Sequence, residues 1–123
     1  MSKAKTVALW IVSGILGAMF LLAGGMKLLQ LDKVKPMFVQ YGYAAWFATF
    51  IGVCEALGGL GVLVPRVAGL AAACLSVIMV GAVYTHVSHH EFIHALTPLV
   101  LFLLLAWVSY VRFQARPSAN LKR

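Results

Sequence analysis

The chain has 123 residues, of which 63% are hydrophobic and only 11% are charged, whereas a soluble domain is usually about half apolar and about a quarter charged. Its ten lysines and arginines outnumber its three acids, but they gather at the ends of apolar runs, which indicates membrane orientation rather than nucleic-acid binding. Composition therefore excludes an ordinary soluble domain and predicts one integral membrane domain over residues 1–123, in contact with the lipid bilayer.

Four apolar runs each approach the roughly 20 residues that a helix needs to cross about 30 Å of hydrocarbon. We expect membrane helices at residues 7–29, 44–64, 67–87 and 95–113, followed by a polar tail over 114–123. Lipid offers no partner for open strand edges, and short connections make successive helices antiparallel neighbours. The sequence therefore predicts an all-α fold, an antiparallel transmembrane four-helix bundle.

The first helix carries small residues at helical spacing, which lets helices approach closely in lipid. They follow two stripes, one with Gly17 and Gly24 and the other with Gly14, Ala18 and Gly25. We therefore expect this helix to pack on more than one side. Lys27 continues the first stripe and has two interpretations. It extends to the lipid headgroups as a snorkelling lysine, or it turns inward because its stripe is rich in glycine.

Residues 30–43, between the first two runs, are amphipathic. Val34, Phe38 and Tyr41 recur at steps of four and three residues, and Pro36 suits an early helical position. We expect a short interfacial helix that lies on the membrane surface. The alternative is that this segment dips inward and covers an opening in the bundle.

Glu55 lies near the centre of the second run, where an ionised group costs on the order of a few kcal/mol. One interpretation is a neutral Glu55 that bonds a backbone carbonyl or Ser76 of the third run. The interpretation that we favour is an outward-opening polar cavity around Glu55, with Lys27, Tyr84 and His86 nearer its mouth. Depth is the objection, because Lys27 and His86 lie near helix ends, whereas Glu55 is about ten residues, or ~15 Å, further in.

Aromatic residues open the second run, as is typical of the belt at a membrane interface. If residues 30–43 cover the cavity, then the side chains at its entrance are those of Tyr41, Tyr43 and Trp46. The cavity and its cover would then lie on the same side of the membrane as the histidine-rich connection described next.

Residues 86–94 hold all four histidines of the chain. His86, His89 and His90 share a helical face, and a metal site there is a weak alternative. We favour a polar, pH-sensitive cap at the headgroup boundary, without a metal.

The two cysteines, Cys54 and Cys74, both lie inside apolar runs and form no C-x-x-C motif. Burial disfavours the reactive thiolate. We therefore expect two reduced cysteines that act as small apolar side chains, and not a redox pair.

The distribution of positive charge predicts the orientation of the chain. The side that holds both termini has seven lysines and arginines: Lys3, Lys5, Arg66, Arg112, Arg116, Lys122 and Arg123. The opposite side has three: Lys27, Lys33 and Lys35. The positive-inside rule then places both termini in the cytoplasm. The expected location is the inner membrane of a bacterium.

Several segments in this order resemble the DoxX-like family: GILGAMFLLAGGMKLL, YGYAAWF, IGVCEALGGLGVLVPRVAGLAAA and MVGAVYTH, which cover roughly residues 10–110. Members of this family are small four-helix membrane proteins. The resemblance carries the family pattern onto Lys27, Glu55, Tyr84 and His86 as a ligand or proton site. It also implies a link to quinone-dependent redox systems, after which the family is named, although related members assist receptor assembly.

Three functions are consistent with these observations. The first is a quinone- or lipid-linked redox accessory subunit, whose redox centre belongs to a partner enzyme because the chain has no flavin, haem or nucleotide motif. The second is an assembly factor or chaperone-like scaffold for other membrane proteins. The third is a small proton-coupled transporter that titrates at Glu55 and works as a homo-oligomer. Whether the chain is itself an enzyme stays open.

Overall fold

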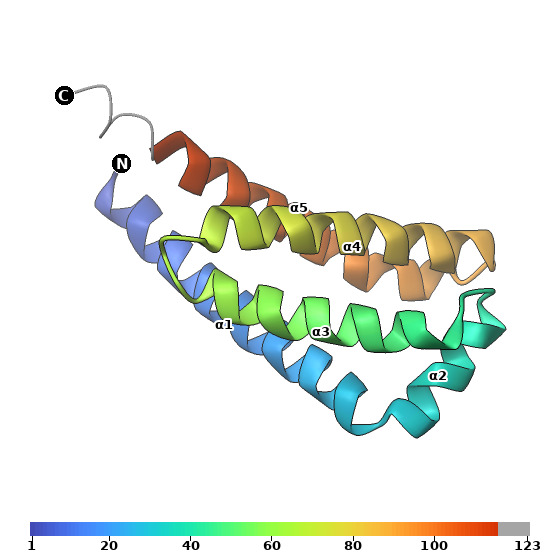
Figure 1. Ribbon diagram of the computed structural model, residues 1–123. Coiled ribbons are helices and arrows are strands. Elements are labelled where there is room, and N and C mark those ends of the chain that lie inside the picture. Colours follow the sequence, from blue (N-terminus) through green and yellow to red (C-terminus); the bar gives the residue numbers. More distant parts are fainter. Residues whose placement is uncertain (116–123) are drawn as a thin grey trace.

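The computed structural model describes residues 1–115, all of whose regular elements are helices (Figure 1). The elements are α1 (Lys3–Leu29), α2 (Leu31–Gln40), α3 (Ala45–Val62), α4 (Ala68–Ser88) and α5 (Phe92–Ala115). All except α2 are long and apolar enough to cross a membrane. The predicted all-α bundle of four spans, with a short helix between the first two, is confirmed.

The helix ends differ from the predicted ones for local reasons. α1 begins earlier because the Ser2 hydroxyl caps it, accepting a hydrogen bond from the backbone N–H of Lys5 at 3.1 Å. α5 begins earlier because the Glu91 carbonyl accepts the Ala95 N–H at 3.1 Å, ahead of Pro98. It continues to Ala115, so the first two residues of the predicted tail are helical. The rest of that tail, including the three basic residues counted for orientation, lies outside the described residues.

Glycines let the backbones of α1 and α3 touch. They recur at seven-residue spacing on both helices, with Gly17 and Gly24 on α1 facing Gly59 and Gly52 on α3. A Cβ added at Gly24 would lie 2.6 Å from the Gly52 carbonyl oxygen, and one at Gly17 would lie 2.9 Å from that of Gly59. Helices in lipid gain no hydrophobic stabilisation from contact with each other, so close van der Waals packing of this kind stabilises the helix pair instead. The first predicted stripe is therefore the α3-facing side of α1.

The second stripe of α1 behaves differently. A Cβ at Gly14 or Gly25 would meet no atom of the described chain within 4 Å, and Ala18 is exposed. Where α1 does pack a second time, it does so against α5. The prediction that α1 packs on more than one side is confirmed by its contacts with α3 and α5, but within residues 1–115 the second side is not this stripe.

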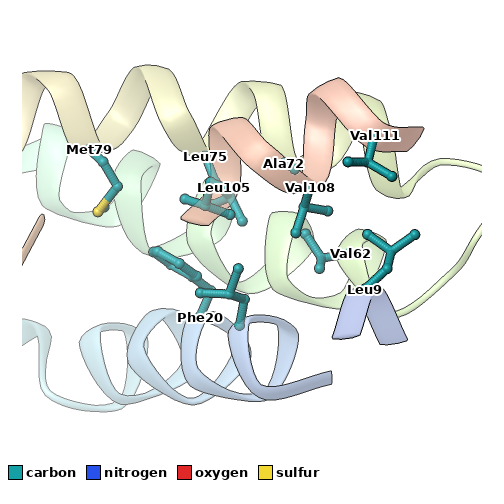
Figure 2. Close-up of a cluster of buried hydrophobic side chains, with 10 residues drawn as sticks. Leu9, Phe20, Val62, Ala72, Leu75, Met79, Leu105, Val108 and Val111 are labelled. Atoms are coloured by element: carbon teal, nitrogen blue, oxygen red, sulfur yellow. The ribbon is translucent and has the colours of Figure 1, made fainter. Parts of the chain in front are cut away.

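A buried apolar cluster joins the four spans (Figure 2). α1 packs mainly on α3, α5 packs mainly on α4, and α3 lies against α4. The largest fully buried side chains come from all four spans: Leu9, Leu16, Val62, Leu75, Leu105 and Val108. The N-terminus, the α3–α4 connection and the end of α5 lie at one end of the molecule, and α2 lies at the other (Figure 1).

Candidate functional site

An ion pair joins α1 to α3 inside the bundle. The Lys27 Nζ donates a hydrogen bond to the Glu55 Oε1 at 2.7 Å, and the two side chains are 29% and 6% exposed. The glycine contact creates this pair, because a Cβ at Gly52 would lie 3.3 Å from the Lys27 Cβ. The stem of the lysine therefore rests on the bare backbone of α3, one turn before Glu55.

These contacts decide between the alternatives for both residues. Lys27 turns inward, so the snorkelling interpretation is wrong. The partner of Glu55 is Lys27 and not Ser76, whose hydroxyl donates to the Ala72 carbonyl at 2.8 Å. The objection of depth is removed because α1 ends at Leu29, beside Gly52, well short of the first turn of α3. α2 spans the remaining distance (Figure 1).

A second polar group lies at the α2 end of the bundle, and we call it the latch: Tyr41, His86 and Glu91. The Tyr41 hydroxyl donates to the Glu91 Oε1 at 2.8 Å, and the His86 Nδ1 lies 2.8 Å from the same oxygen. Close by, the hydroxyls of Tyr43 and Thr85 share a hydrogen bond of 2.6 Å. The segment after α2 is therefore tied to the end of α4 and to the α4–α5 connection.

Electrostatics within the latch follow from these hydrogen bonds. Those from His86 and then from Tyr41 hold the pKa of Glu91 below its usual value, because they stabilise the ionised carboxylate. The hydrogen bond to Glu91, aided by burial, raises the pKa of Tyr41. At neutral pH the latch therefore holds a carboxylate and a neutral phenol.

The four residues predicted to share a site are thus divided. Lys27 and Glu55 are together, whereas His86 belongs to the latch. Tyr84 is 68% exposed, because it lies on the face of α4 opposite to the buried side. It lines a hollow of about 340 Å³ formed by α4 and α5, with Val80, Val83, Val87, Leu99 and Phe102.

The predicted entrance residues are divided in the same way. Tyr41 and Tyr43 make the polar contacts described above. Trp46 is 67% exposed and packs edge-on against Phe47, with ring centroids 5.8 Å apart. The indole therefore belongs to the aromatic belt that faces the surroundings.

The structure does not gather the histidines into a metal site. The His89 Nδ1 lies 2.8 Å from the Thr85 carbonyl, and His90 leaves the helix with a φ of 60°. Within residues 1–115 there is no group of three or more histidine, cysteine, aspartate or glutamate side chains that could hold a metal ion. Cys54 is partly buried, Cys74 is exposed, and both are free thiols.

Sequence reasoning missed the role of Glu91. This carboxylate follows His86 by five residues, but its contact with Tyr41 joins positions 50 apart in the chain. Residues 30–43 and residues 86–94 were predicted to lie on the same side of the membrane. That prediction places both segments at one end of the bundle, but it does not identify the contact between Tyr41 and Glu91.

Comparisons with known proteins agree with the fold. A sequence model described as the DoxX-like family matches residues 11–109, which is most of the chain. Neither the search of curated proteins nor that of solved structures gave a match.

Proposed function

Because the chain belongs to the DoxX-like family, we propose that it is an accessory subunit of a membrane redox system and binds a quinone or another lipid-like molecule. The proposed ligand site is the Lys27–Glu55 pair, and the proposal includes a polar cavity beside it. The chain has no flavin, haem or nucleotide motif, so the redox centre belongs to a partner enzyme. The proposed location is the bacterial inner membrane, with both termini in the cytoplasm.

One observation carries this proposal: the ion pair leaves hydrogen-bonding capacity unused. A lysine ammonium has three donors, and Lys27 uses one of them, toward Glu55, within the described residues. Its side chain is 29% exposed, so the other donors are accessible. A buried ion pair is favourable only when its remaining donors and acceptors are also satisfied. A carbonyl oxygen on the head of a lipid-like molecule would satisfy Lys27 from the exposed side.

The direct test is to purify the protein gently and to measure the quinone that each molecule retains by mass spectrometry. The K27M and E55Q variants should lose the ligand, while K33M, an exposed lysine in α2, should keep it. Charge reversal separates ligand binding from structure. The double variant K27E/E55K restores the ion pair but moves the ammonium to α3, so it should stay folded and bind poorly. A double variant that keeps its full complement of quinone would contradict the proposal.

A second candidate function rests on a different feature, the unpacked stripe of Gly14, Ala18 and Gly25. Small residues in lipid favour contact with another helix, and a chaperone-like assembly factor needs such a face. The variant G14V/G25V would then lose co-purifying membrane subunits and keep any bound quinone. Co-purification of a soluble oxidoreductase, unaffected by G14V/G25V, favours the redox role instead.

The proposed orientation has its own test. A cysteine introduced at Ser118, which lies outside the described residues, should resist a label added to the periplasm. One placed at Lys33 in α2 should react. Labelling of the cysteine at Ser118 together with protection of the cysteine at Lys33 would show that the orientation is the reverse of the proposed one.

A further inference from the structure

The end of the bundle that holds the N-terminus, which we call the terminal end (Figure 1), has positive charge and, among residues 1–115, no acidic side chain. The chain has three acids, Asp32, Glu55 and Glu91. The first lies in α2 and the third in the latch, both at the opposite end, and the second is bound to Lys27. The basic side chains described at the terminal end are Lys3, Lys5, Arg66 and Arg112.

Arg112 differs from the other basic residues of this end because it is partly buried. Its guanidinium carbon lies 5.2 Å from the centroid of the Trp10 ring, a cation–π contact between α5 and α1. Its stem lies against α4, since a Cβ at Gly69 would be 3.1 Å from the Arg112 Cβ. Three helices thus hold the side chain in one place.

The Arg112 Nε is buried and has no hydrogen-bond partner among residues 1–115. Buried donors in folded proteins are nearly always paired, and a guanidinium stays charged throughout the ordinary pH range. This Nε itself has no exposed surface, so an acceptor from outside the chain meets the guanidinium at its terminal amino groups. An anion with several oxygens fits best, because the planar fork of arginine matches phosphate and carboxylate geometry with two parallel hydrogen bonds.

The position of Arg112 relative to the hydrocarbon layer identifies the source of that anion. α5 has 24 residues and is therefore roughly 36 Å long, which exceeds about 30 Å of hydrocarbon. Arg112 lies in its last turn and contacts a tryptophan, the residue type that marks the headgroup level. Lipid phosphates lie at this level.

The surface of α1 next to Trp10 points to a lipid rather than to free phosphate. A shallow hollow of about 650 Å³ lies along the first turns of α1, lined by Lys3, Ala4, Val7, Ala8 and Ile11 and by neither Trp10 nor Arg112. Apart from the lysine its walls are apolar, which suits an acyl chain. We propose that Arg112, braced by Trp10, binds the phosphate of an acidic phospholipid at the terminal end. This site is separate from the Lys27–Glu55 pair and does not depend on the function proposed above.

The test is native mass spectrometry of the full chain in detergent, titrated with phosphatidylglycerol. R112Q should weaken the apparent affinity about tenfold, the loss expected for one charge-assisted hydrogen bond. R66Q is the matched control, because it removes one charge from an exposed arginine at the same end, and it should bind like the unaltered protein. R112K keeps the charge but loses the planar fork, so it should weaken binding several-fold.

Three results would overturn the proposal. Equal losses in R112Q and R66Q would show diffuse attraction to positive charge instead of a site. Displacement of the lipid by millimolar inorganic phosphate would identify free phosphate as the ligand. If R112Q does not fold, R112K decides, and an unchanged affinity in R112K refutes the role of the guanidinium.

Discussion

Removal of either partner of the Lys27–Glu55 pair should destabilise the protein. The structure predicts that the free energy of unfolding falls by different amounts in the two cases. In K27M, the Glu55 side chain is left 6% exposed without its counter-charge, which should lower the free energy of unfolding by about 3 kcal/mol. In E55Q, Lys27 is 29% exposed and its long stem can carry the ammonium toward the headgroups. The loss should then be about 1 kcal/mol, closer to that of an exposed pair.

The assay is equilibrium unfolding in mixed detergent micelles, with K33M as the control for removal of an exposed lysine. The double variant K27M/E55L replaces the whole pair by apolar side chains and should lie within about 1 kcal/mol of the unaltered protein. The sum of the losses in K27M and in the single variant E55L should then exceed the loss in the double variant, and the difference measures the coupling between the residues. A larger loss in E55Q than in K27M, or additive losses in the double variant, would refute this reasoning.

Three other predictions use the same preparation. G24A should destabilise by about 1–3 kcal/mol because overpacking forces the α1 and α3 backbones apart, whereas G25A, where a Cβ meets no described atom, should leave the melting temperature unchanged. Because the pKa of Glu91 is lowered from 4.5 in the folded state, its contribution to stability is present above that value and is lost as the pH falls through the folded pKa. The melting temperature should therefore fall as the pH is lowered below about 4.5, and E91Q should reduce that fall. Replacement of both Cys54 and Cys74 by alanine should leave the ligand content and melting temperature nearly unchanged, and a loss in either single variant would reopen the redox-pair hypothesis.

The sequence by itself determined the architecture and which residues of α1 share a face. Runs of apolar residues predict membrane helices because each must satisfy its own backbone in lipid, and the observed spans follow those runs closely. Periodicity also placed Lys27 on the glycine-bearing face of α1, and its side chain is found on that side of the helix. Periodicity defines which residues share a face, and it does so without knowledge of the neighbouring helix.

Only the tertiary structure decided how far each helix slides along its neighbour. The contact of Gly24 with Gly52 sets that offset, so α1 ends beside the middle of α3 and Lys27 reaches Glu55. The same offset lets the segment after α2 bring Tyr41 to Glu91, a contact between positions 50 apart. A helical pattern repeats along its axis and carries no information about axial position. Backbone contacts at the glycines, made only when both helices are present, supply that information.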